Sequence, residues 1–180
     1  MPVVRRLKRG LDLCLEALVA VVMGVLVIDV TWQVVTRFVL GDPSSWTEEL
    51  ATFLRIWVGL LGASVALKRG AHLGIDYFVS GLSPRKRIGT EVLVFAVTAL
   101  FSLLVLVGGG VSLVREVLAR GQTSPALGLK MGYVYLALPI SGFFLMLYSV
   151  EFLIERIVAL IKGVPVSEDR RSEVEAGGLE

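Results

Sequence analysis

The sequence predicts an all-α integral membrane protein with four transmembrane helices, from its hydropathy, its four long apolar stretches and the placement of its basic residues. Hydrophobic residues make up 55% of the 180 residues, the mean hydropathy is +0.78 and only 19% of residues are charged. A soluble domain of this size has more charge and shorter apolar runs. A helix needs about 20 apolar residues to cross the hydrocarbon core of a bilayer. The stretches that meet this requirement lie near residues 13–38, 46–67, 88–113 and 132–161.

The first stretch follows a basic N-terminal segment, residues 1–12, in which Arg5–Arg9 holds four basic residues. A basic start followed by an apolar run is also typical of a secretory signal peptide. The run from Leu13 to Val35 is longer than a typical signal core, and no small-residue cleavage pattern closes it. We therefore expect a retained helix, and a transmembrane domain over residues 13–162.

The third and fourth stretches contain residues that favour close packing or a break in a helix. Gly108–Gly110 could be a hinge, and close helix packing explains these glycines equally well. Pro139, followed by Ser141 and Gly142, predicts a kink or local unwinding. Broken helices mark binding sites in transporters, where they usually occur as a pair in internal repeats. No second copy is visible in this sequence.

Basic residues at the ends of the four stretches predict the orientation in the membrane. Thirteen of the 18 Lys and Arg residues lie at the two termini or in the second connection, and four lie on the opposite side. Because cytoplasmic segments are enriched in Lys and Arg, this bias places both termini in the cytoplasm. The sequence therefore predicts an N-in, C-in protein.

Two segments outside the spans have distinct compositions. Residues 72–82 are apolar but too short to span, and basic residues follow them, so we expect an interfacial helix on the cytoplasmic side. His72 and Asp76 within it are four apart and could bind a metal, although two ligands make a poor site and a surface pair is the simpler interpretation. Residues 163–180 are rich in Glu, Ser and Gly and predict a disordered cytoplasmic tail.

Polar residues in the first two spans predict a ladder between them. The Gly-Asp-Pro-Ser sequence at residues 41–44 predicts a short turn, so residues equally far from it should lie at equal depth in two antiparallel helices. Each span holds three polar residues spaced three or four apart, and this spacing puts them on one helix face. The expected pairs are Arg37 with Glu48, Gln33 with Thr52, and Asp29 with Arg55.

Pairing would lower the cost of charges at membrane depth. An unpaired charge at the centre of a membrane helix costs roughly 2.5–3.5 kcal/mol on insertion scales, and a partner reduces the cost of burial. Asp29 could instead be a proton or cation site, as acidic residues inside membranes often are. Glu48 and Glu49 could form an ion-entry pair, or they stabilise the N-terminus of the second helix, where negative charge is favoured.

The second helix also carries small residues that continue the face of these charges. Gly59 with Ala63, and Gly62 with Ala66, are pairs of small residues four apart, which allow another helix to approach closely. Trp46 would anchor the start of this helix at the membrane interface. The residues for which we expect helix packing or subunit contact are Trp46, Glu49, Trp57, Gly59, Gly62, Ala63 and Ala66.

Composition and motifs exclude several classes of protein. With one cysteine, Cys14, and one histidine, His72, this chain alone cannot form an intrachain disulfide, a haem site with two histidines or a Cys/His zinc site. The net charge of +2 is too small to indicate nucleic-acid binding. No Gly-rich phosphate loop follows a strand, and no nucleophile-and-base signature is present. We therefore expect neither enzyme activity nor a bound cofactor.

Two stretches of the sequence together carry a specific set of motifs. The first contains Arg37-Phe38, Trp46–Ala51, Trp57–Ala63 and Lys68–Asp76, and the second contains Thr123–Leu129, Gly132-Tyr133 and Leu138-Pro139. Their combination resembles the small membrane subunit of tripartite ATP-independent periplasmic (TRAP) transporters, the DctQ type. The resemblance covers roughly residues 10–160.

The resemblance implies a subunit of the bacterial inner membrane with two protein partners. A periplasmic binding protein of the DctP type captures an organic acid, and a large permease subunit of the DctM type holds the substrate and Na⁺ sites. The small subunit braces the large one, and the resemblance places no cofactor in it. We hypothesise that Asp42, Arg120 and Lys130 in the periplasmic loops contact the binding protein. Membrane lipids are the remaining expected partners.

The sequence therefore predicts the small permease subunit of a secondary active transporter, a symporter of an organic acid such as a C4-dicarboxylate or sialic acid. One alternative is a small standalone channel or carrier with Asp29 as its ion site. Another is an assembly scaffold of a different membrane complex.

Overall fold

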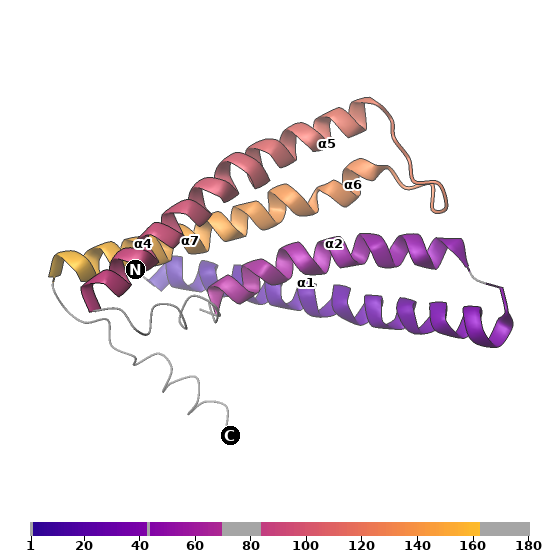
Figure 1. Ribbon diagram of the computed structural model, residues 1–180, viewed down its shortest axis with the longest axis horizontal. Coiled ribbons are helices and arrows are strands. Elements are labelled where there is room, and N and C mark those ends of the chain that lie inside the picture. Colours follow the sequence, from indigo (N-terminus) through magenta and orange to yellow (C-terminus); the bar gives the residue numbers. More distant parts are fainter. Residues whose placement is uncertain (1, 43, 70–83, 163–180) are drawn as a thin grey trace, which may run out of the picture.

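The computed structural model describes residues 2–42, 44–69 and 84–162, and within these ranges the chain is almost entirely helical (Figure 1). The elements are α1 (Pro2–Val35), η1 (Thr36–Leu40), α2 (Ser45–Lys68), α4 (Pro84–Phe101), η2 (Ser102–Gly109), α5 (Gly110–Ala119), α6 (Met131–Tyr135) and α7 (Ala137–Lys162), where η denotes a π-helical segment. The all-α fold is confirmed. The predicted interfacial helix, with His72 and Asp76, and the predicted tail at 163–180 lie outside the described residues.

Four stretches of helix in the described part are long and apolar enough to cross a membrane. They are Gly10–Leu40, Ser45–Lys68, Ile88–Ala119 and Met131–Val158. Between 17% and 28% of the residues in their apolar windows are buried inside the chain. Most of the surface of these helices is therefore left for lipid or for another subunit.

The helices form two antiparallel hairpins (Figure 1). In one hairpin α1 packs on α2, and in the other the rod formed by α4, η2 and α5 packs on α7. Contacts between α2 and α7 join the two hairpins. Figure 1 shows them converging at the end where α1 begins and α7 ends.

The buried core lies toward this convergent end. Its buried members come from α1, α2, α4 and α7: Leu15, Leu61, Leu67, Phe95 and Tyr148. Phe95 also stacks on Phe152 of α7, with ring centroids 5.3 Å apart. This cluster fixes the four helices against one another near the end where α1 begins and α7 ends.

Two glycines lie at close contacts between α7 and the rod formed by α4, η2 and α5. A Cβ added to Gly142 would lie 2.6 Å from Cβ of Leu106, and one added to Gly110 would lie 3.0 Å from Cδ of Pro139. Both positions are therefore sites of close helix approach. For Gly110 the structure favours close packing over a hinge.

The predicted break near Pro139 is present. Helix α6 ends at Tyr135, and α7 begins at Ala137 after a single turn residue, Leu136. Proline has no amide N–H, so Pro139 cannot donate to the carbonyl of the residue four positions earlier, which is Tyr135. The fourth span is consequently interrupted one turn before the proline.

Candidate functional site: two interhelical ties and an exposed face of α2

At the convergent end, Lys68 near the end of α2 binds two carboxylates of α1. Its Nζ lies 2.9 Å from Oε1 of Glu16 and 3.2 Å from Oδ2 of Asp12. The neighbouring Arg69 lies 3.6 Å from Glu16 and is more exposed. One ammonium group therefore neutralises two acidic side chains that are four residues apart on α1.

The same end also ties α1 to α7. The phenol of buried Tyr148 donates a hydrogen bond to Oδ1 of Asp12 at 2.7 Å, and Lys8 forms an ion pair with Glu151. We define Lys8, Asp12, Glu16, Lys68, Tyr148 and Glu151 as the terminal clamp. The clamp joins three helices by charge and hydrogen bonding.

A separate ion pair joins α4 to α7 at this end. Nε of Arg156 lies 3.0 Å from Oε2 of Glu91. Lys68 and Arg156 contributed to the predicted orientation, and Lys68 also belongs to the motifs that resemble the DctQ type, whereas Asp12 and Glu16 were not predicted as site residues. The available signal was the spacing of Asp12 and Glu16, which puts two acids on one face of the first helix beside a basic segment.

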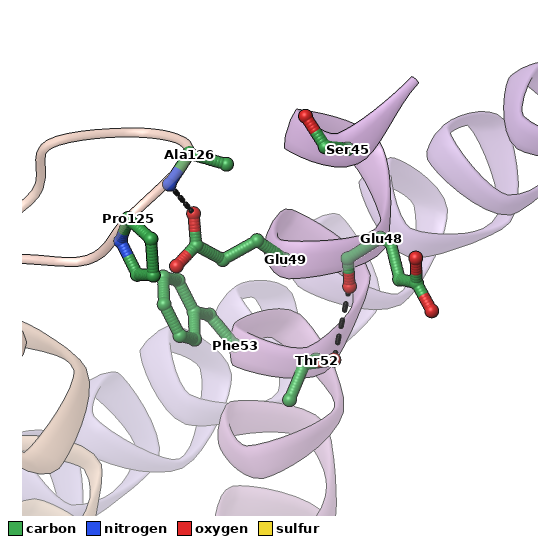
Figure 2. Close-up of a pocket in the computed structure, with 7 residues that line it drawn as sticks. All are labelled: Ser45, Glu48, Glu49, Thr52, Phe53, Pro125 and Ala126. Carbon is green, nitrogen blue, oxygen red and sulfur yellow. Dashed lines mark hydrogen bonds between the residues drawn. The ribbon is translucent and has the colours of Figure 1, made fainter. Parts of the chain in front are cut away.

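At the opposite end, Glu49 of α2 binds the loop between α5 and α6. Its Oε2 accepts hydrogen bonds from the backbone N–H of Ala126 at 2.9 Å and of Leu127 at 2.8 Å. Figure 2 shows the Glu49 side chain reaching this loop beside Pro125 and Phe53. Glu49 therefore binds another part of the chain, a contact that neither ion entry nor helix-end stabilisation describes, and those two interpretations stay predictions.

The loop is shaped by its own hydrogen bonds. The N–H of Ser124 donates to the carbonyl of Leu129 at 2.8 Å, and the N–H of Gly128 donates to the carbonyl of Ser124 at 3.1 Å. Gly128 has φ of 65°, a conformation that glycine adopts without steric cost. This arrangement leaves the N–H groups of Ala126 and Leu127 free to bind the carboxylate of α2.

The structure corrects the predicted pairing of Asp29 with Arg55. Nε of Arg55 donates to the carbonyl of Ala51 in its own helix at 3.2 Å, and Oδ2 of Asp29 has no hydrogen-bond partner among the described residues. Asp29 shares a hollow with Trp46 and Leu50 of α2. Because Arg55 follows Leu50 by five residues, it lies about 140° around the helix from that hollow.

The other two predicted pairs are not formed in the described part of the chain either. The guanidinium of Arg37 lies 5.9 Å from the centre of the adjacent Phe38 ring, and the hydroxyl of Thr52 donates to the carbonyl of Glu48 at 2.9 Å. No ion pair joins Arg37 to Glu48, and no hydrogen bond joins Gln33 to Thr52, within these ranges. The ladder is therefore absent from the isolated chain.

The connection between the two helices explains this correction. The end of the first span is π-helical over Thr36–Leu40, and a π-helix has more residues per turn than an α-helix. Ser44, before α2, is extended. Figure 1 shows α2 starting set back from the end of η1. The predicted pairs require two α-helices joined by a compact turn, and the π-helical segment and extended Ser44 change both the relative depth and the relative rotation of the two helices.

Asp29 lies at a hollow between the first two helices. The residue is 6% exposed. The hollow is lined by Val25, Ile28, Asp29, Trp32, Trp46 and Leu50. Burying a carboxylate with an unpartnered oxygen among apolar side chains costs free energy. Asp29 therefore remains a candidate functional residue. Its role as an ion site stays a prediction.

Five of the α2 residues for which we expected helix packing or subunit contact divide into two groups. Trp57 is half-buried against the core cluster. Gly59, Ala63 and Ala66 are exposed, and Gly62 is half-buried. A Cβ added to Gly59 or to Gly62 would meet no atom within 4 Å. These small residues therefore do not pack closely within the described chain.

Comparison with known proteins decides the family. Residues 26–159 match the family described as tripartite ATP-independent periplasmic transporters, DctQ component. The chain belongs to this family. The matched region includes α2, the loop that binds Glu49 and most of α7.

Individual relatives of this DctQ-family chain carry transporter names. The sialic acid TRAP transporter small permease protein SiaQ of Vibrio cholerae is 31% identical over 153 residues, which are 84% of this chain and 86% of that protein. The C4-dicarboxylate TRAP transporter small permease protein DctQ of Rhodobacter capsulatus is 33% identical over 97 residues, 54% of this chain and 42% of that protein.

A third relative is a longer protein. The isethionate TRAP transporter permease protein DctMQ of Oleidesulfovibrio alaskensis is 31% identical over 136 residues, which are 69% of this chain and 20% of that protein. The family and these relatives make this DctQ-family chain a multi-pass membrane component of a transporter and not an enzyme.

The three residues predicted to meet a binding protein are all exposed at the end opposite the terminal clamp. Asp42 lies between η1 and α2, and its N–H donates to the carbonyl of Thr36 at 3.2 Å. Arg120 forms an ion pair with Glu116, one turn earlier on α5. Lys130 precedes α6 and forms a β-bridge with Thr123. Their position at one end permits a shared contact, which stays a prediction.

No metal-binding cluster of three or more His, Cys, Asp or Glu side chains occurs in the described residues of this DctQ-family chain. Within the terminal clamp, the acidic side chains Asp12, Glu16 and Glu151 form ion pairs with lysines.

Proposed function

We propose that this chain is the small permease subunit that braces the large permease subunit of a TRAP transporter in the bacterial inner membrane. The observation that carries the proposal is the DctQ-family match over residues 26–159, which spans helices of both hairpins. A similar segment forms part of the longer permease protein DctMQ, which supports close association with a large subunit.

The geometry supports a bracing role. The terminal clamp joins α1, α2 and α7 at one end, and Glu49 joins α2 to the α5–α6 loop at the other. Both hairpins are therefore held at both ends. A four-helix body restrained in this way can support a mobile partner while its own helices stay in place.

The orientation follows from the basic residues. We place the clamped end, where α1 begins and α7 ends, in the cytoplasm because Lys and Arg are concentrated there. Asp42 and the loop from Arg120 to Lys130 then face the periplasm. A DctP-type binding protein would contact the transporter on this side through Asp42, Arg120 and Lys130.

The transported substrate is an organic acid, and the driving force is an ion gradient, most simply of Na⁺. The names of relatives support sialic acid or a C4-dicarboxylate as the substrate class. The substrate and Na⁺ sites belong to the large subunit in this proposal. This chain contributes support and docking surface.

Reconstitution tests the proposal. Proteoliposomes would contain this chain and its large permease, with the binding protein outside, and uptake of radiolabelled sialic acid or succinate would be followed under an inward Na⁺ gradient. We expect uptake that is lost when this chain, the binding protein or the gradient is omitted. Replacing Na⁺ by K⁺ is the control for ion coupling.

The standalone carrier is tested in the same system. Proteoliposomes that contain this chain alone should show no substrate uptake and no ²²Na⁺ entry above empty liposomes. Flux through the chain alone that is lost in Asp29→Asn would overturn the proposal in favour of a carrier with Asp29 as its ion site.

A further inference from the structure

The surface of α2 differs from that of the other spans. Between Thr47 and Lys68, α2 exposes no large apolar side chain. Helix α1, by contrast, exposes large apolar residues along its length, among them Leu13, Val21 and Ile28. Lipid chains suit the surface of α1, and the surface of α2 needs a different neighbour.

The exposed residues of α2 form one continuous stripe. Beyond Trp46 and up to the end of the helix, they are Glu48, Thr52, Arg55, Gly59, Ala63 and Ala66, spaced three or four apart. This spacing keeps all of them on one face along the whole span. We call this set the α2 stripe.

Arg55 is the residue of the stripe that most requires a partner. It lies about 15 Å along the helix from Ser45, well inside the span. Its side chain makes one hydrogen bond, from Nε to Ala51, and no ion pair within the described residues. A guanidinium has five N–H donors. An exposed arginine at membrane depth requires an acceptor, and lipid chains offer none.

The small residues of the stripe indicate the shape of that partner. Gly59, Ala63 and Ala66 present little side chain, so another helix can approach the α2 backbone closely. A Cβ on Gly59 meets nothing within 4 Å, so the space beside it is open in the isolated chain. The stripe therefore combines a charged site for an acidic group with a flat surface for a helix.

We propose that the α2 stripe is the surface on which a membrane-spanning helix of the large permease packs, with an acidic side chain of that helix level with Arg55. The inference rests on the proposed function, because it takes the large permease as the partner. Charge complementarity at Arg55 selects a protein helix over lipid.

The α2 stripe also leads toward the hydrogen bonds between Glu49 and the α5–α6 loop. At its outer end, Glu48 and Thr52 line a hollow with Pro125 and Ala126, beside the bond from Glu49 to the loop (Figure 2). A helix seated on the stripe would pass next to this loop. The hydrogen bonds between Glu49 and the loop would then lie at the edge of the subunit interface.

Photo-crosslinking in the intact complex tests the surface directly. A benzoylphenylalanine at Ala63 should crosslink to the large permease. The matched control is Gly24, which is exposed on α1 beside the large apolar residues Val21 and Ile28, and which should not crosslink. A crosslink from Ala63 to a second copy of this chain would overturn the proposal in favour of self-association.

Substitutions supply a second measurement, the recovery of the large permease with the affinity-tagged small subunit. Gly59→Leu fills the space that the partner helix needs, so we expect recovery to fall about tenfold or more, whereas Gly24→Leu should change it by less than about twofold. A Cβ at either glycine meets no atom within 4 Å, so the two variants are matched. Circular dichroism of the purified subunit should show unchanged helix content in both.

The charge is tested at Arg55. Arg55→Gln should lower recovery about tenfold because it leaves the partner's carboxylate unpaired, and Arg55→Lys should restore most of it because it keeps the charge. If Gly59→Leu and Arg55→Gln behave like Gly24→Leu while the large permease is still recovered, the surface assignment is wrong and the proposed function stands. If the unsubstituted chain recovers no large permease, the proposed function itself fails.

Discussion

The two ends of the bundle are held together in different ways. At the end where α1 begins and α7 ends, the six side chains of the terminal clamp connect α1, α2 and α7 through several ion pairs and a hydrogen bond. At the opposite end, one carboxylate, Glu49, accepts both hydrogen bonds between α2 and the α5–α6 loop. The first end is held by several interactions, whereas the second is held through a single residue.

The two ends should therefore respond differently to single substitutions. Loss of a peripheral clamp member leaves other interactions in place, so its effect should be limited. Loss of Lys68 removes the shared partner of Asp12 and Glu16, and loss of Glu49 removes the hydrogen bonds to the loop entirely. The terminal clamp is therefore expected to tolerate single substitutions better than the α5–α6 loop, which one side chain holds.

The largest effect is expected from Lys68→Met, which keeps the apolar stem and removes the charge. Asp12 and Glu16 then lose their shared cation while partly buried. We expect the free energy of unfolding to fall by about 1.5–3 kcal/mol, the range for hydrogen bonds to charged groups. The measurement is unfolding in mixed micelles by SDS titration.

Arg69→Met is the matched control for Lys68→Met. The Arg69 side chain is 65% exposed and lies 3.6 Å from Glu16, so we expect its removal to cost less than about 0.5 kcal/mol. Equal losses in the two variants would show that Lys68 is not the centre of the clamp.

A smaller effect on stability, and a large local one, is expected from Glu49→Ala. The N–H groups of Ala126 and Leu127 lose their acceptor. We expect a loss of about 1–2 kcal/mol and hydrogen exchange at these two amides faster by about tenfold or more. Glu48→Ala is the control, because the Glu48 side chain is exposed and does not bind the loop. Unchanged exchange in Glu49→Ala would show that other contacts hold the loop.

The smallest effect is expected from Tyr148→Phe. This change removes the hydroxyl bound to Asp12 and keeps the buried ring. Because Asp12 retains Lys68, we expect a loss of about 1 kcal/mol in the same SDS titration. Tyr133→Phe on α6, where the side chain is 58% exposed, should have no measurable effect. A loss in Tyr148→Phe as large as that in Lys68→Met would contradict a distributed clamp.

The spans and the break at Pro139 could be predicted because they depend on properties of single residues or short segments. Twenty apolar residues form a membrane helix wherever they occur, and a proline without an N–H interrupts the helix that contains it. The polar ladder could not be predicted in the same way. It required the rotation of α1 against α2, and the π-helical segment Thr36–Leu40 with the extended Ser44 changed that rotation.

The all-α membrane class, the number of spans and the resemblance to the DctQ family followed from the sequence alone, because hydropathy and motifs depend only on the order of residues along the chain. Only the tertiary structure decided that Glu49 binds a loop 77 residues away, that Lys68 joins Asp12 and Glu16, and that Arg55 faces outward. Such outcomes depend on how rigid helices rotate and cross when they pack. A shift of one residue turns a helix by about 100°. A small change in the connection between two helices can therefore move a side chain from the buried face of a helix to its exposed face.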